Sequence, residues 1–82
     1  TTEVPVGKFV AISANIPAPV LHELMPALSR ALVPGGALFL AGFIAKEQAS
    51  LDAAARLNGL CPTAVHEVRG WLGLTYVRSR PE

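Results

Sequence analysis

Unbroken runs of apolar residues occur twice in the first half of the chain, and each run predicts a buried strand. Residues 8–14 are mostly apolar and partly β-branched, and two prolines follow them at positions 17 and 19. Residues 37–43 form the second run, directly after Pro34-Gly35-Gly36. Continuous apolar strands are typical of parallel sheets that are covered on both faces.

A predicted helix follows each run. Residues 19–32 predict an amphipathic helix, in which Pro26 should cause a kink or divide the segment into two short helices. Residues 33–36 should then stop this helix and turn the chain. Residues 46–57 are rich in good helix formers and predict a second helix, which Asn58-Gly59 would end with a left-handed cap.

The last part of the chain predicts an antiparallel hairpin. After Pro62, residues 63–68 and 71–78 are β-prone, and Arg69-Gly70 separates them. Strand alternation in the second stretch places three side chains on one face: Leu72, Leu74 and Tyr76.

These elements predict a single α/β domain over residues 1–82. It comprises a lead-in (1–7), two strand–helix units (8–58) and a terminal hairpin (63–80) in a mixed sheet. Right-handed crossovers that step in one direction put both helices on the same face. The other face and the edge of the first strand would then lack cover, which favours part of a larger doubly wound sheet over a complete small fold.

Composition supports an incomplete unit and excludes several classes of partner. Of the 82 residues, 51% are hydrophobic and only 16% charged, which is apolar for so small a domain. The net charge of +1, without clustering, gives no indication of nucleic-acid or membrane binding. No apolar run reaches the roughly 18 residues of a membrane span. The start at Thr1, without a signal-peptide pattern, suggests a fragment or a processed product.

Few side chains are placed for acid–base, metal or thiol chemistry. His22 and His66 lie on different elements, and we expect neither a metal site nor a catalytic acid–base pair. Glu47 and Asp52 should lie on the solvated face of the second helix. Cys61, the only cysteine, is expected to be a structural thiol and is compatible with the cytoplasm.

The aromatic and basic residues of the hairpin also have structural explanations. Trp71 and Tyr76 are expected to pack on the sheet or on a helix. Three arginines are expected to be exposed residues that favour solubility: Arg69, Arg78 and Arg80.

Three segments together resemble one family. Residues 9–18 read Phe-Val-Ala-Ile-Ser-Ala-Asn-Ile-Pro-Ala, residues 32–36 Leu-Val-Pro-Gly-Gly, and residues 42–48 Gly-Phe-Ile-Ala-Lys-Glu-Gln. Their order and spacing, with a Trp after the hairpin turn, resemble the ribosomal protein L11 methyltransferases over residues 5–80. The resemblance implies the C-terminal part of a Rossmann-like class I methyltransferase fold.

The same resemblance implies that Asn15 contacts S-adenosylmethionine and borders the pocket where the acceptor amine meets the methyl group. On the residues alone, Asn15 before Pro17 is better explained as a turn residue whose side chain satisfies backbone groups. Methyl transfer depends mainly on alignment of the two reactants, so the lack of a catalytic triad is no objection. Pro17 and Val10 depart from the family's usual Leu and Asp, which puts acceptor specificity in doubt.

The family's Gly-rich loop and its ribose-binding acidic residue would lie upstream of Thr1, and the chain has no Gly-x-Gly-x-Gly. We therefore expect part of a cytoplasmic enzyme that methylates amines of a ribosomal protein, inactive and without cofactor binding when alone. Its expected partner is the missing N-terminal half, or a second copy at the first strand's edge. The alternatives are a stand-alone interaction module, which pairs through that edge, and a class I methyltransferase with a small-molecule or nucleic-acid acceptor.

Overall fold

The computed structural model describes residues 9–79, which form four strands and two helices in the predicted order. The elements are β1 (Phe9–Ala14), α1 (Ala18–Ala31), β2 (Leu32–Phe43), α2 (Ala45–Leu57), β3 (Leu60–Val68) and β4 (Trp71–Arg78). The lead-in and residues 80–82, including Arg80, lie outside the described part of the chain.

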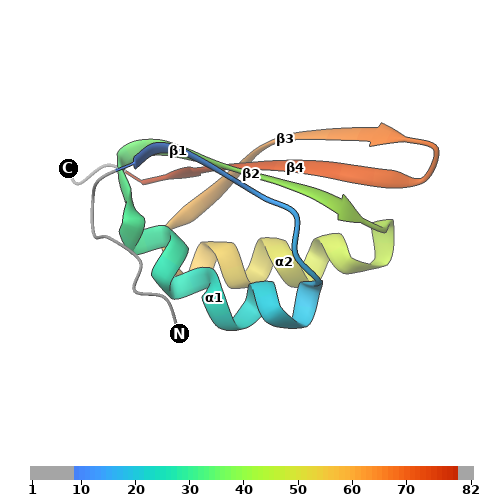
Figure 1. The fold of residues 1–82 in the computed structure, drawn as a ribbon, viewed down its shortest axis with the longest axis horizontal. Helices are drawn as coiled ribbons and strands as arrows, with labels where there is room; N and C mark the ends of the chain where they lie inside the picture. The colour runs from blue at the N-terminus through green and yellow to red at the C-terminus, as the bar shows by residue number, and fades with distance from the viewer. Residues whose placement is uncertain (1–8, 80–82) are drawn as a thin grey trace.

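The strands form one mixed sheet in the order β1-β2-β4-β3 (Figure 1). β1 and β2 are parallel, whereas β4 runs antiparallel to both β2 and β3. The carboxyl ends of β1 and β2 therefore meet at one edge of the sheet, called here the carboxyl edge. Leu72 pairs with Phe43 at the end of β2, so the β3–β4 turn lies at this edge as well.

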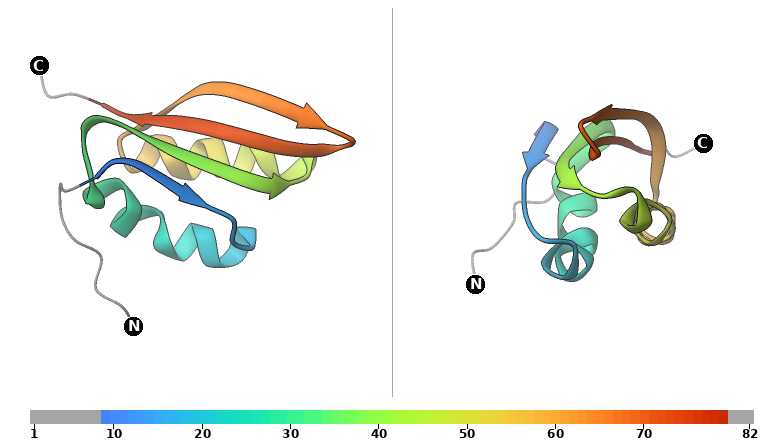
Figure 2. Two further views of the ribbon diagram at one scale, coloured as in Figure 1. Left: turned by 45° about the horizontal axis from the view of Figure 1, so that its top comes forward. Right: turned by 90° about the vertical axis from the view of Figure 1, so that its right-hand side faces the viewer.

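Both helices cover the same face of the sheet, as the crossover rule predicts (Figure 2). The core between sheet and helices consists of Leu21, Met25, Leu32, Leu38, Leu40, Phe43, Leu51, Ala55, Leu60, Leu72, Leu74 and Tyr76. On the other face no described helix lies over the sheet, and Phe39 is 44% exposed. The prediction that the first strand is buried is wrong for this chain, because β1 is an edge strand and Val10 is 74% exposed.

Each helix shows the local signals that set its limits. α1 continues through Pro26 as a single helix, so the two-helix alternative is wrong. The stabilisation from packing the apolar face of α1 on the sheet exceeds the cost of the backbone hydrogen bond that the proline removes. At the start of α2, Glu47 Oε1 accepts a hydrogen bond from the Ile44 amide at 3.0 Å. Gly59 has φ 76° directly after Asn58, as predicted for a left-handed cap.

Two strands extend across residues that the sequence places in turns. β2 already pairs at Leu32, opposite Phe9, and the next pair joins Ala11 to Ala37. The intervening Val33-Pro34-Gly35-Gly36 bulges out of the ladder, so the chain turns without leaving the strand. Pro62 likewise lies within β3, where an edge strand tolerates a residue that donates no ladder hydrogen bond.

Two polar side chains that the sequence assigned to the surface are tied into the fold. Asp52 Oδ1 accepts a hydrogen bond from the buried Tyr76 hydroxyl at 2.5 Å, so Asp52 does not lie on a solvated face. The Arg78 guanidinium donates to the backbone carbonyl of Leu32 and, at 3.4 Å, to that of Arg30. Arg78 therefore caps the end of α1, and its prediction as an exposed arginine is wrong.

Candidate functional site

Asn15 lies at the carboxyl edge, directly after β1 and before Ala18, where α1 begins. The side chain is exposed. It makes none of the side-chain hydrogen bonds found among residues 9–79. The structure therefore gives no support to the turn-residue explanation, which requires such a bond to a backbone group. The carboxamide keeps donors and an acceptor for a ligand at this edge.

Gly42 lies beside Asn15 from the neighbouring strand. It falls between Ala41 and Phe43, where the register of β2 against β4 shifts, and it has φ 91°. This is a bulge with a glycine in a left-handed conformation, one residue before β2 ends. A Cβ atom added to Gly42 would lie 2.8 Å from Asn15 Oδ1, so the carboxamide occupies the space that a side chain would take.

The hairpin adds exposed apolar residues to the same edge. Trp71 begins β4 and is 57% exposed, and Val68, which ends β3, is 67% exposed. The prediction that Trp71 packs on the sheet or on a helix is wrong for this chain, whereas Tyr76 is fully buried as predicted. The reason is position: Trp71 adjoins the turn, and strand alternation points it away from the face that the helices cover.

A shallow cavity of about 320 Å³ lies between the first turns of α1 and α2. Its lining comprises Ala18, Pro19, His22, Lys46, Glu47 and Ser50. His22 Nε2 and the Ser50 hydroxyl are hydrogen-bonded across it at 3.0 Å. The polar groups here therefore join the two helices to each other, through His22 and Ser50, and cap the start of α2, through Glu47.

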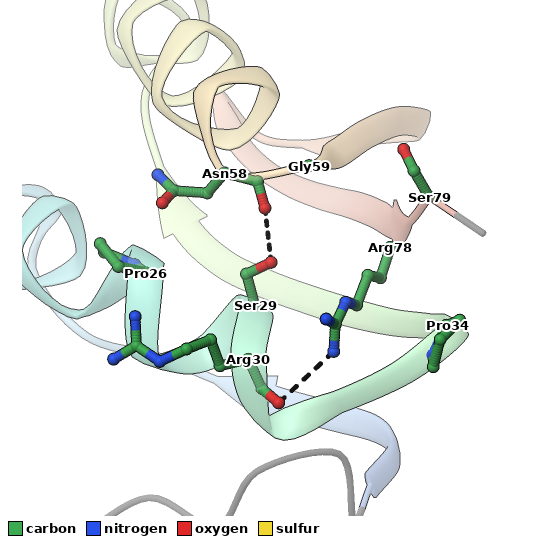
Figure 3. A pocket seen from close by; sticks show the side chains of 8 residues that line it. All are labelled: Pro26, Ser29, Arg30, Pro34, Asn58, Gly59, Arg78 and Ser79. Atoms are coloured by element: carbon green, nitrogen blue, oxygen red, sulfur yellow. Dashed lines mark hydrogen bonds between the residues drawn. The ribbon is translucent and has the colours of Figure 1, made fainter. Parts of the chain in front are cut away.

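A second cavity, of about 490 Å³, lies at the opposite end of the sheet (Figure 3). Its lining comprises Pro26, Ser29, Arg30, Pro34, Asn58, Gly59, Arg78 and Ser79. The Ser29 hydroxyl donates to the Asn58 carbonyl at 2.5 Å and so ties the ends of the two helices together. Ligands of open α/β sheets bind beyond the carboxyl ends of the strands, so this cavity is the poorer candidate.

Among residues 9–79, no group of three or more His, Cys, Asp or Glu side chains is arranged to hold a metal ion. His22 and His66 lie on α1 and β3. Cys61 is a free, exposed thiol with the Ser79 hydroxyl 3.4 Å away, so it has no core role. Neither described helix is long and apolar enough to cross a bilayer.

The mixed sheet order and its two helices are those of a class I S-adenosylmethionine-dependent methyltransferase fold. The solved structure of a ribosomal protein L11 methylase from Lactobacillus delbrueckii subsp. bulgaricus superposes with a TM-score of 0.80. That match has 28% identity and covers 90% of this chain and 38% of the other. A 1,6-didemethyltoxoflavin-N1-methyltransferase from Burkholderia thailandensis, solved with S-adenosylhomocysteine, shares the fold with a TM-score of 0.74 at 14% identity, over 92% and 46% of the chains.

Sequence comparison specifies the family. A model of the ribosomal protein L11 methyltransferase (PrmA) family matches residues 1–79. The ribosomal protein L11 methyltransferase of Cellvibrio japonicus is 38% identical over 77 residues, which are 93% of this chain. The chain belongs to the ribosomal protein L11 methyltransferase family. It spans 26% of the length of the Cellvibrio relative.

Proposed function

We propose that this chain is the C-terminal portion of the catalytic domain of a protein methyltransferase, and that Asn15 forms part of its S-adenosylmethionine site. The observation that carries the proposal is the placement of Asn15. Its carboxamide makes no side-chain hydrogen bond within residues 9–79 and is exposed at the carboxyl edge, beside the bulge at Gly42. An amide that both donates and accepts hydrogen bonds suits a cofactor with amino, carboxylate and hydroxyl groups.

The described residues fit one side of such a site and not the whole of it. S-adenosylmethionine, when bound, supplies the methyl group. This chain would contribute an orienting side chain and a wall of the pocket, and alignment of this kind is the main requirement of a displacement at carbon. The chain has no Gly-x-Gly-x-Gly, so the loop that holds the cofactor must come from other sequence.

The rest of the catalytic domain would also complete the sheet. The open edge of β1 and the uncovered face around Phe39 would receive a further strand and further helices from the N-terminal half. We therefore propose that the chain alone neither binds the cofactor nor transfers methyl groups. Amines of a ribosomal protein are the proposed acceptor, from the name of the family, and a cytoplasmic location would follow from such a substrate.

A chimera tests this proposal, in which the present chain replaces the matching segment of the Cellvibrio japonicus relative. The chimera is expected to methylate ribosomal protein L11, and Asn15→Ala to reduce the rate by at least about ten-fold through lost orientation. Asn58→Ala is the matched control, because the Asn58 side-chain amide donates a hydrogen bond to the Ala54 carbonyl at the far end of α2. Equal activity of a folded Asn15→Ala chimera would remove Asn15 from the site.

The uncovered edge of β1 also favours a second candidate, an interaction module that pairs through this strand. An edge strand with Phe9 41% and Val10 74% exposed, and with unpaired backbone groups, is a template for another chain. This candidate predicts a stable oligomer of the 82-residue chain, whereas a methyltransferase portion needs its upstream half. A third candidate, a methyltransferase for small molecules or nucleic acid, is distinguished by the acceptor that the chimera uses.

A further inference from the structure

Gly42 meets two separate geometric demands at the carboxyl edge. Its φ of 91° lies in the left-handed region, which residues with a side chain rarely adopt. Its missing side chain also leaves the space that Asn15 Oδ1 occupies, 2.8 Å from where a Cβ atom would lie. Gly59 and Gly70 share only the first demand, since their φ angles are 76° and 83° and an added Cβ would meet nothing within 4 Å.

We propose that Gly42 is a positioning residue, whose bulge and bare Cα form the seat that fixes the Asn15 carboxamide at the carboxyl edge. The inference rests on the proposed function, because it adds to the cofactor site a residue that touches no ligand. Bulges next to active sites commonly re-aim side chains in this way.

The physical basis is that no side-chain hydrogen bond within residues 9–79 holds Asn15. Packing must therefore set the direction of its carboxamide. Gly42 on the neighbouring strand is the residue that leaves room for it, since an added Cβ would lie 2.8 Å from Asn15 Oδ1. A methyl group at position 42 would occupy the seat and displace the carboxamide, although Asn15 itself would be unchanged.

Side-chain amide resonances of the 82-residue chain report this directly. The chain has two asparagines and one glutamine, so few such signals occur, and Asn15→Ala assigns the Asn15 pair by its loss. Gly42→Ala is expected to shift the Asn15 pair and leave the Asn58 pair, whose donor bonds to Ala54 at 2.8 Å. Gly70→Ala adds comparable backbone strain without a Cβ contact and should leave both pairs in place.

Gly42→Ala measured in Asn15→Ala protein separates the effect of the clash with Asn15 from that of backbone strain at position 42. Strain at φ 91° is present in both backgrounds, whereas the clash requires the Asn15 side chain. Gly42→Ala should therefore lower the melting temperature less in Asn15→Ala protein than in the parent chain. If Gly42→Ala alone does not fold, recovery of folding in the double variant supports the seat, and failure of the double variant to fold overturns it.

The proposal is overturned if the Asn15 amide resonances do not shift in folded Gly42→Ala protein. It is also overturned if Gly42→Ala lowers the melting temperature equally in the parent chain and in Asn15→Ala protein. These readouts need no cofactor, so they are distinct from a failure of the methyltransferase assignment. In the chimera, Gly42→Ala is expected to reduce methyl transfer by up to about 100-fold. In the Asn15→Ala chimera the same change should cause little further loss, because both act through one side chain. If the two substitutions instead reduce the rate by independent factors that multiply, the proposal is overturned.

Discussion

The hydroxyl of Tyr76 donates a hydrogen bond to Oδ1 of Asp52 at 2.5 Å and so joins the centre of the sheet to α2. Tyr76 is fully buried, and among residues 9–79 no buried side-chain polar atom lacks a partner. This pair therefore satisfies a polar group at the centre of the core.

Tyr76→Phe keeps the ring and removes the donor. We expect the free energy of unfolding to fall by about 1.5–3 kcal/mol, the usual contribution of a hydrogen bond to a charged group. Urea denaturation followed by circular dichroism measures this. Thr63→Val is the control, because the Thr63 hydroxyl donates to the Thr75 carbonyl at a longer 3.3 Å and is exposed. A loss for Tyr76→Phe no larger than that of the control would show that the pair contributes little.

The same pair predicts an alkaline limit to stability. Burial, the hydrogen bond to Asp52 and the negative charge of Asp52 raise the pKa of Tyr76 well above its usual value of about 10. The folded chain then retains the phenolic proton above about pH 10, whereas the unfolded chain releases it. This contribution to stability is full below about pH 10 and is lost as the pH rises further.

Tyrosinate absorbance tests the prediction, since Tyr76 is the only tyrosine. The folded chain should show no tyrosinate at a pH where the urea-unfolded chain has titrated. In Tyr76→Phe protein, the part of the alkaline loss that comes from this group should disappear. Ionisation of folded Tyr76 near pH 10 would contradict the burial and the Asp52 contact.

The hydrogen bonds from Arg78 to the end of α1 give a second test of the fold. Arg78→Ala removes the donor to the Leu32 and Arg30 carbonyls and should destabilise the chain by about 1–3 kcal/mol, because these carbonyls lie at the end of α1. Arg78→Lys should recover only part of this loss, since a lysine lacks the planar fork. Arg56→Ala, at an exposed position in the last turn of α2, should change stability by less than about 0.5 kcal/mol. Equal effects at positions 78 and 56 would contradict the capping role.

If the chain is an interaction module, the open edge of β1 predicts concentration-dependent self-association of the isolated chain. Val10→Lys should reduce the mass measured by light scattering at high concentration, because a charged edge residue disfavours strand pairing. Val68→Lys is the matched control, since Val68 is similarly exposed but lies on β3, at the other edge. If only Val68→Lys reduces the mass, the chains associate through β3 and not through β1.

Local signals in the sequence predicted most of the elements. Helix-forming residues and the Asn58-Gly59 cap predicted α2 with its start misplaced by one residue, and strand alternation placed Leu72 and Leu74 in the core. The errors concern long-range partners: strand pairing keeps Pro62 within β3, and Arg78 caps a helix 46 residues earlier in the chain. Such partners depend on the tertiary fold, which no local pattern specifies.

In the candidate site, too, the sequence predicted the local placement of a residue but not its long-range neighbour. The sequence placed Asn15 after a strand and before a helix, and the structure places it there. It did not indicate that Gly42 lies beside Asn15, because that contact depends on the bulge in β2 and on the register between β1 and β2. A glycine near the end of an apolar run was the only signal, and a glycine at that place fits the end of a strand equally well.

Calorimetric titration of S-adenosylmethionine tests the central claim most directly, with the 82-residue chain and the chimera measured side by side. Light scattering and circular dichroism first establish that both are folded. We expect no saturable heat for the isolated chain, saturable binding by the chimera, and weaker binding by the Asn15→Ala chimera. Saturable binding by the monomeric 82-residue chain, or none by the folded chimera, would contradict the claim that this chain supplies one side of a divided cofactor site.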